Sequence, residues 1–318
     1  MTCDRMRRNQ THDRIKNRTT GFKDARCYTL WRRRSGRQGR VFWYNFSYSV
    51  QVREGVRLKV ADLESVLDES VPYSWAEEWD NVGLLLGDRN DAVAGVAVAL
   101  DPSIEAMRMA LERGCSVLVT HHPLLLAPLK RFDCSEGVGA ALSFAIRNGL
   151  SLFSLHTNWD VSHIGVNAVI SNALGLREVM PLIPSPGSSG PWGAGAVGLL
   201  PQTLRLKDCG VGIKNTLELS RLEIHGDVSD GVSSLALCGG SGGSLWRYAR
   251  ASGADAYFTA DMKYHERLEA LDSGMALFIA DHGEMERFSM KELADTLSEA
   301  TGLKTILLDP PSCHFCML

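Results

Sequence analysis

The sequence predicts an α/β protein with layered sheets, and three observations support this class. From about residue 61 onward, apolar runs of strand length alternate with segments that have helical periodicity. The 318 residues include 45% apolar and 22% charged residues, an ordinary composition for a chain that buries a core. A Pro-, Gly- and Ser-rich break at 184–194 divides the pattern near its middle, so we expect two lobes joined by a linker or crossover.

The periodic segments place the expected elements along the chain. The first convincing helix begins near Val60, where Val60, Leu63, Val66 and Leu67 repeat at helical spacing. Apolar runs indicate strands at 82–86, 94–100, 116–120, 151–156, 195–200, 221–225, 233–238, 256–259, 276–280 and 305–308. Periodic segments indicate further helices at 103–113, 137–148, 164–174, 244–252, 264–272 and 287–300.

Residues 1–58 differ from the rest of the chain in charge. Sixteen of the 34 basic residues but only four of the 37 acids lie within the first sixty positions, a net charge of +12, which leaves 18 basic and 33 acidic residues, or −15, for the remainder. Because this stretch also lacks a sustained apolar period, we interpret it as a disordered extension or a mis-assigned start. A nucleic-acid-binding arm and an organelle transit peptide are the alternatives. A chain beginning near Leu58 should then keep its fold, its oligomeric state and any metal that it binds.

Composition also restricts where the protein works. No unbroken apolar run exceeds nine residues, about half of what a membrane-spanning helix needs, so a membrane protein is not expected. Eight scattered cysteines and the lack of a signal-peptide pattern favour a reducing, cytoplasmic setting. We interpret the lone C-x-x-C formed by Cys313 and Cys316 as a frayed tail. The net charge of −15 outside the N-terminal region disfavours long nucleic acids as partners.

Two adjacent histidines follow the expected strand at 116–120. Side chains alternate along a strand, so His121 and His122 can converge on one site only where the chain leaves the strand, and Pro123 favours such a departure. Loops beyond the carboxyl ends of strands are where open α/β sheets bind ligands. The pair is therefore a candidate for half of a metal site, with ordinary hydrogen-bonded loop histidines as the alternative.

Two further strand ends carry a histidine and an acid four residues apart. His156 and Asp160 follow one expected strand, and His282 and Glu286 follow another. Residues at this spacing share one face wherever the chain turns helically. Together the three strand ends deliver four histidines and two carboxylates, a mixed nitrogen and oxygen set that suits Zn, Mn, Fe or Co. With so many ligands a second ion becomes reasonable, with Asp160 bridging the two.

A serine nucleophile is the competing interpretation. Residues 239–243 match the G-x-S-x-G pattern between an expected strand and an expected helix, and Asp261 and His282 follow in the chain order of an α/β-hydrolase triad. Only 77 residues follow Ser241, however, which is short for that fold, and the histidine pair would have no role. We therefore favour a tight glycine turn or an anion-binding nest over a nucleophile.

Six blocks of sequence, taken in order, resemble the Nif-three-like dinuclear metal-binding family, whose members bear the name GTP cyclohydrolase 1 type 2 homologs. The resemblance covers about residues 59–310. The blocks are WAEEWDNVGLLLGD at 75–88, VLVTHHPLLL at 117–126, LHTNWD at 155–160 with GVN at 165–167, CGGSGGS at 238–244, GADAYFTADMKYH at 253–265 and DHGEMERF at 281–288.

The resemblance implies a site and an assembly. The family's metal ligands correspond to His121, His122, Asp160, His282 and Glu286. His156 would lie close by, where we expect it to make a structural hydrogen bond or, alternatively, to orient a ligand or move a proton. The implied architecture is two α/β lobes with layered mixed sheets, spanning 59–183 and 195–318, with two divalent ions in the cleft between them. A toroidal homohexamer is implied as well.

The resemblance further implies a reaction class and shows two departures from the family pattern. A dinuclear site typically activates water, so we expect a metal-dependent hydrolase that opens the imidazole ring of GTP or a related small nucleotide. A non-catalytic metal-binding scaffold or metal-handling protein is the alternative. Asp281 and Ala260 replace residues usual in the family, and Asp281 is expected to add a charge beside the site. Trp75 and Trp79 are expected to pack against the protein rather than face a ligand.

Overall fold

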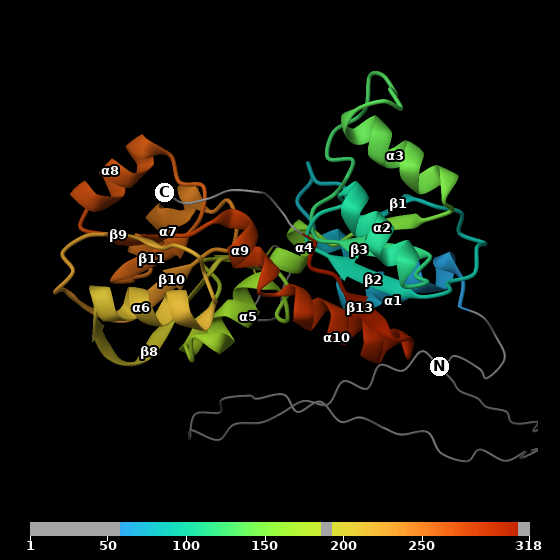
Figure 1. Ribbon diagram of the computed structural model, residues 1–318. Helices are drawn as coiled ribbons and strands as arrows, with labels where there is room; N and C mark the ends of the chain where they lie inside the picture. The colour runs from blue at the N-terminus through green and yellow to red at the C-terminus, as the bar shows by residue number, and fades with distance from the viewer. Residues whose placement is uncertain (1–57, 186–192, 311–318) are drawn as a thin grey trace, which may run out of the picture. The chain divides into compact units, whose positions relative to one another are not determined.

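The computed structural model describes residues 58–185 and 193–310. The predictions for the basic extension and for the C-terminal Cys313 and Cys316 therefore lie outside the described residues, as does most of the central break. Everything described belongs to one compact unit that contains two mixed sheets and their helices, labelled in Figure 1. The predicted α/β class with layered mixed sheets is confirmed.

The first sheet has five strands, of which three form a parallel core. The central strands β2, β3 and β4 run parallel, β13 adds to them in parallel, and β1 pairs antiparallel at the other edge. In spatial order the strands are β1 (Gly83–Leu86), β4 (Ser151–Ser154), β3 (Val117–Thr120), β2 (Val96–Ala99) and β13 (Thr305–Leu307). Because β3 and β4 are adjacent and parallel, the residues that follow them emerge at the same edge of the sheet.

Helices pack on both faces of the first sheet, because alternate residues of its strands point to opposite sides. Val96 and Val98 join a cluster with the helices α1 (Val60–Ser70) and α10 (Met290–Thr301). Ala97 and Ala99 join a second cluster with α2 (Ile104–Glu112) and α3 (Gly137–Arg147). Strands buried on both sides explain the unbroken apolar runs in the sequence.

The second sheet has six strands around another parallel core. Strands β10, β11 and β12 run parallel, and β5, β8 and β9 pair antiparallel outside them. In spatial order the strands are β5 (Arg177–Met180), β8 (Ala196–Arg205), β10 (Gly231–Leu237), β11 (Ala256–Thr259), β12 (Ala276–Ile279) and β9 (Glu223–His225). One face packs on α6 (Leu206–Thr216) and the other on α7 (Trp246–Ala251) and α8 (Tyr264–Asp272).

Short elements connect the sheets and complete the fold. The helical ones are η1 (Tyr73–Trp75), α4 (Thr157–Asp160), α5 (Val166–Ala173), η2 (Gly243–Leu245) and α9 (His282–Arg287). A two-stranded ribbon, β6 (Ile183–Pro184) with β7 (Gly193–Ala194), flanks the undescribed residues of the central break. None of the helices in the described part of the chain is both long and apolar enough to span a membrane.

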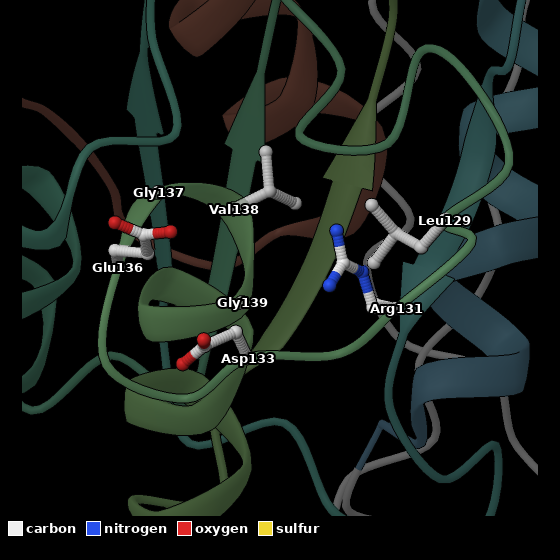
Figure 2. Close-up of a pocket in the computed structure, with 7 residues that line it drawn as sticks. All are labelled: Leu129, Arg131, Asp133, Glu136, Gly137, Val138 and Gly139. Atoms are coloured by element: carbon white, nitrogen blue, oxygen red, sulfur yellow. The ribbon is translucent and has the colours of Figure 1, made fainter.

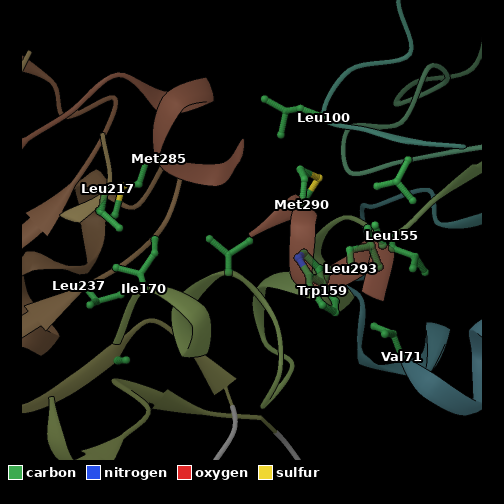
Figure 3. Close-up of a cluster of buried hydrophobic side chains, with 14 of the residues drawn as sticks. Val71, Leu100, Leu155, Trp159, Ile170, Leu217, Leu237, Met285, Met290 and Leu293 are labelled. Atoms are coloured by element: carbon green, nitrogen blue, oxygen red, sulfur yellow. The ribbon is translucent and has the colours of Figure 1, made fainter. Parts of the chain in front are cut away.

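One apolar cluster continues from the first sheet to the second. It includes Leu155 and Trp159 after β4, Met285 and Met290 from α9 and α10, and Leu237 at the end of β10, all buried (Figure 3). Burying a side chain of this size stabilises the fold by roughly 1.5–3 kcal/mol. The loops that follow β4 and β12 are therefore held in place by packed side chains.

Sheet membership does not follow the lobe boundaries expected from the sequence. Strand β5 at 177–180 lies ahead of the central break yet pairs with β8 in the second sheet. Strand β13 at 305–307 comes after the whole second sheet yet pairs with β2 in the first. The division into lobes at 59–183 and 195–318 stays a prediction. Each sheet nevertheless contains one strand from the other side of this boundary.

Candidate metal centre

Six titratable side chains gather where three strands end. His121 and His122 follow β3, His156 and Asp160 follow β4, and His282 and Glu286 lie on α9 directly after β12. They form three overlapping groups, in each of which the ligand atoms lie within 4.8 Å of one another. These groups are His121 with His122 and His156, His122 with His282 and Glu286, and His121 with Asp160 and Glu286. The structure thus brings together all six side chains singled out in the sequence.

Glu286 lies at the centre of this cluster and is only 3% exposed. Its Oε2 is 2.9 Å from Nε2 of His122 and 3.0 Å from Nε2 of His282. Its Oε1 faces Nε2 of His121 at 3.6 Å. His282 is the first residue of α9 and Glu286 lies one turn later, so the predicted spacing of four residues does place both on one helix face. The two carboxylate oxygens of Glu286 therefore face two different sets of nitrogen atoms.

Two buried atoms of the cluster have no hydrogen-bond partner. These atoms are Nε2 of His121, whose ring is fully buried, and Oδ1 of Asp160, and they lie 3.6 Å apart. Leaving a buried polar atom unpaired costs about 1–3 kcal/mol, so a fold keeps such atoms only for a reason. A cation between the two atoms would satisfy both.

Each histidine of the cluster is anchored through its Nδ1 atom. His121 Nδ1 lies 2.9 Å from the carbonyl oxygen of Leu155, so this nitrogen donates its hydrogen there. The other three rings contact aspartates at Nδ1, namely His122 with Asp101 at 2.7 Å, His156 with Asp80 at 2.8 Å and His282 with Asp261 at 2.5 Å. A hydrogen on Nδ1 leaves the lone pair on Nε2, which is the form that binds a metal, and a carboxylate partner makes that nitrogen a better ligand.

The proximity of these charges shifts the pKa values of the cluster. Burial alone would lower the pKa of His122, but its hydrogen bonds to Asp101 and Glu286 outweigh burial and raise it to about 10. The hydrogen bond to Glu286 raises the pKa of His282 to about 9. Burial raises the pKa of Asp160 to about 6. Burial would raise the pKa of Glu286 too, but the neighbouring imidazoles hold it well below its usual range.

The side chain of Asn167 joins the ligand-bearing loop after β4 to the glycine-rich loop after β10. Its amide nitrogen donates to the carbonyl oxygen of Asp160 at 2.9 Å, and its amide oxygen accepts from the N–H of Gly239 at 2.9 Å. Gly240 then lies against the cluster, where a Cβ would be 2.0 Å from Oε1 of Glu286. This glycine also has φ of +65°, which favours glycine. An added Cβ would also clash at two other glycines of the loop, at 2.3 Å from a neighbouring side chain at position 239 and at 2.5 Å at position 242. The loop at 239–243 is therefore rich in glycine because it is closely packed, and at Gly240 it packs against the cluster.

The serine-nucleophile alternative finds little support in this geometry. Asp261 does contact Nδ1 of His282, as the triad order predicted, but Nε2 of that ring contacts Glu286. Within the described residues no hydrogen bond joins the exposed Ser241 to His282. The glycine pattern at 239–243 is accounted for by the close packing of this loop, in which Gly240 lies against the cluster.

One expectation about a neighbouring residue needs correction. Trp79 does not pack into the protein, because 60% of its surface is exposed. Trp75, in contrast, is half-buried with its ring edge-on to His163. Asp281 directly precedes His282, and its carboxylate caps α9 by accepting from the N–H of Glu284 at 3.1 Å, while its effect as a charge beside the site stays a prediction. Such a cap stabilises the helix start by about 1 kcal/mol.

Hollows elsewhere on the described surface do not coincide with the cluster. One lies in the loop before α3 and is lined by Leu129, Arg131, Asp133 and residues 136–139 (Figure 2). Another lies beside the second sheet and is lined by Asp227, Asp230 and Asp255 among others. Neither contains a histidine, so neither offers the mixed donor set of the cluster.

The donor set fits one or two divalent transition-metal ions. It supplies imidazole nitrogen and carboxylate oxygen, the ligands that Zn, Mn, Fe and Co share. The two unpaired buried atoms and the Nδ1 anchors are the features expected of a site built for a cation.

Sequence reasoning missed the groups that orient the ligands. Asp80 and Asp101 were not singled out, and Asp261 was considered only as a triad member. Asp80 also accepts from the N–H and the hydroxyl of Thr157, at 3.0 and 2.5 Å, so it fixes the start of α4. Asp101 shortly follows the end of β2, and its place just beyond a strand end next to the histidine pair was the available signal.

Comparison with known proteins identifies relatives along most of this chain. The family model described as Duf34/NIF3 (NGG1p interacting factor 3) matches residues 58–310. A GTP cyclohydrolase 1 type 2 homolog of Streptomyces coelicolor is 34% identical over 232 residues, which cover 72% of this chain and 81% of that protein. A protein of the same name from Clostridium acetobutylicum is 30% identical over 254 residues, 79% of this chain and 95% of that one. The crystal structure of a Bacillus cereus protein related to NIF3 shares the fold, with a TM-score of 0.78 at 21% identity over 83% of this chain and all of that chain.

Proposed function

Because this chain belongs to the Duf34/NIF3 family, we propose that it is a dinuclear metal-dependent hydrolase acting on a small nucleotide such as GTP. The resemblance noted in the sequence is confirmed by the family match, and relatives bear the name GTP cyclohydrolase 1 type 2 homolog. The observation that carries the proposal is the position of Glu286, whose two oxygens face separate sets of metal-capable atoms.

Each proposed ion has a set of protein ligands. His122 and His282 with Oε2 of Glu286 would hold one ion, and His121 and Asp160 with Oε1 of Glu286 would hold the other. This arrangement supports Glu286 as the carboxylate shared by both ions, a role that the sequence favoured for Asp160. His156 is close to both histidines of the pair, with ring centroids 5.1 and 5.8 Å from His121 and His122.

The surrounding residues support hydrolysis. When bound, two such ions supply Lewis acidity and a water activated near neutral pH. Asp101 and Asp261 hold the rings of His122 and His282 in position, so that the ligand atoms need no rearrangement during reaction. His156 is oriented by Asp80 and could hold or release a proton at Nε2 beside the reacting bond. With GTP, one water would add to C8 and break the C8–N9 bond, which leaves a formamide on N7, and a second water would break the C8–N7 bond and release formate.

Two further properties, the oligomeric state and the location in the cell, are also part of what we propose. We propose the homohexamer that the family resemblance implies, and a cytoplasmic location in keeping with the scattered cysteines. Light scattering coupled to size exclusion measures the first directly: a mass of six chains is expected, and a monomer would contradict it.

A non-catalytic scaffold that binds or hands over metal ions is the second candidate function, because the same ligand set would serve it. Turnover separates the two. Metal-loaded protein is incubated with GTP and a panel of nucleotides while formate and phosphate release are followed. The hydrolase proposal expects formate from GTP and its loss in His122→Ala and Asp160→Ala. Formate release that persists in both variants would refute the dinuclear mechanism, and no activity toward any compound would favour the scaffold.

A further inference from the structure

Trp79 presents an unusually open aromatic ring beside the metal-capable cluster. Its indole is 60% exposed, yet it makes an edge contact with His156, at a centroid distance of 6.0 Å and an interplanar angle of 80°. His156 in turn contacts both histidines of the pair. An edge contact uses at most one face of the indole, so the other face remains available to a ligand directly beside the cluster.

The segment that carries Trp79 is fixed to the site on both sides. Before it, the N–H of Glu77 donates to the hydroxyl of Thr157 at 2.9 Å. After it, Asp80 binds His156 and Thr157, and the side chain of Asn81 donates to the carbonyl oxygen of Leu125. The exposed ring therefore stands on a backbone that is already ordered. Holding a binding group in place before the ligand arrives lowers the entropic cost of binding.

The distance from Trp79 to the cluster restricts what could lie on it. The indole contacts the ring of His156, and His156 in turn contacts the proposed ligands His121 and His122, so a single ring stacked on Trp79 would not reach the proposed ions. A fused two-ring heterocycle could lie with one ring on the indole and present its second ring to the ions. Aromatic side chains stack readily on such bases and contribute substantially to their binding.

We propose that Trp79 is the stacking residue for a purine, holding the six-membered ring while the five-membered ring faces the ions. This inference rests on the proposed function and names its substrate class: purine nucleotides are bound productively and pyrimidine nucleotides are not. The five-membered ring, whose bonds the proposed hydrolysis breaks, is then the part that reaches the reacting centre. Trp79 acts as a specificity residue for that reaction.

Rapid-mixing fluorescence on the full, metal-loaded protein tests the proposal before turnover. The probes are GTP, UTP and inorganic triphosphate, so that the contribution of the base to binding is distinguished from that of the phosphates. We expect GTP to quench the emission of Trp79, UTP to quench it weakly, and triphosphate to leave it unchanged. Trp79→Ala should weaken GTP binding roughly tenfold or more, while Trp79→Phe should keep most of the affinity and lose the quenching. Trp75→Phe is the matched control, because this neighbouring indole packs on His163 outside the cluster.

The outcomes separate this proposal from the proposed function. Equal affinity of wild type and Trp79→Ala for GTP overturns the stacking role even if formate is released. A change in oligomeric mass in Trp79→Ala with unchanged GTP affinity also overturns it, because the indole would then belong to an interface between chains. Purine-selective quenching and weakened binding without formate release would uphold the stacking role while the hydrolase proposal fails. Failure of wild type to bind any of the probes overturns the stacking role outright.

Discussion

Acidic side chains gather both in the hollow beside the second sheet and in the metal-capable cluster, and the two places differ in what those side chains contact. In the hollow beside the second sheet, Asp227 accepts from the N–H and the hydroxyl of Ser229, at 2.9 and 2.6 Å. Asp255 in the same hollow accepts from the N–H groups of Ser233 and Ser234, at 2.8 and 2.9 Å. These carboxylates already have hydrogen-bond donors, and they serve to shape turns.

In the metal-capable cluster, by contrast, two buried polar atoms have no hydrogen-bond partner. His121 Nε2 and Asp160 Oδ1 are buried without partners, and the imidazole Nε2 atoms converge on Glu286. The difference teaches that the number of acids in a place says little about metal binding. A site for a cation is distinguished by buried nitrogen and oxygen lone pairs that no protein group donates to, and by histidine rings whose Nδ1 atoms are held by hydrogen bonds.

The largest expected effect is the selective loss of an ion on removing one ligand. Asp160→Ala should remove the ion held with His121, and His282→Ala the ion held with His122, because each side chain belongs to only one of the two proposed sets. Elemental analysis after dialysis measures this, with Asp227→Asn as the control that changes an acid in the hollow. If Asp227→Asn lowers the metal content as much as Asp160→Ala, the two places do not differ in the way described.

Metal affinity should rise with pH. In the metal-free protein the pKa values of about 10 for His122 and about 9 for His282 lie above neutrality, so both rings hold an extra proton at pH 7. A metal binds the neutral ring and displaces that proton, so affinity increases as pH rises toward these pKa values, about tenfold per pH unit for each proton displaced. Calorimetric titration with Zn²⁺ or Mn²⁺ between pH 6 and 8 measures the slope. A flat profile would show that these histidines are not the ligands.

Removing an orienting carboxylate should weaken binding without abolishing it. Asp101→Asn leaves a side chain of the same size beside Nδ1 of His122 but removes its charge, and such changes typically cost 10- to 100-fold in metal affinity. The same substitution at Asp227 serves as the control. Unchanged affinity in Asp101→Asn would mean that the contact only fills space.

The smallest effect concerns the glycine that touches Glu286. Gly240→Ala should lower the free energy of unfolding by about 1–2 kcal/mol through its positive φ alone, and by more through the contact with Glu286. Gly253→Ala is the matched control, because Gly253 also has positive φ but nothing lies within 4 Å of an added Cβ. Denaturant unfolding compares the two. Equal losses would show that the close approach to Glu286 has no energetic consequence.

Local sequence patterns predicted most strands and the residues of the cluster. They missed elements whose structure depends on packing against the rest of the fold. The helix α6 was missed because Gly210 and Gly212 weaken its helical pattern, yet Gly210 is needed where a Cβ would be 2.6 Å from Ile224. The edge strand β5 was missed because it is largely exposed and Glu178 interrupts it with φ of +55°. In both places a tertiary contact overrides the local signal.

The contacts that Asp80 and Asp101 make with the histidines could not be found from local spacing. Asp80 and His156 are 76 residues apart, and Asp101 and His122 are 21 apart, so their contacts depend on how the strands are ordered in the first sheet. The six cluster residues were predictable because strand ends are recognisable one at a time. Their partners come from loops whose positions only the assembled fold determines.

The stoichiometry of bound metal in wild type and Glu286→Gln tests the central claim most directly. Glu286 presents one oxygen to each proposed ion, and the substitution preserves the volume of this buried side chain while removing its charge. We expect two divalent ions per chain in wild type by elemental analysis and loss of both in Glu286→Gln, with the folded state checked by circular dichroism. A folded Glu286→Gln protein that keeps two ions, or a wild-type protein that binds none, would contradict it.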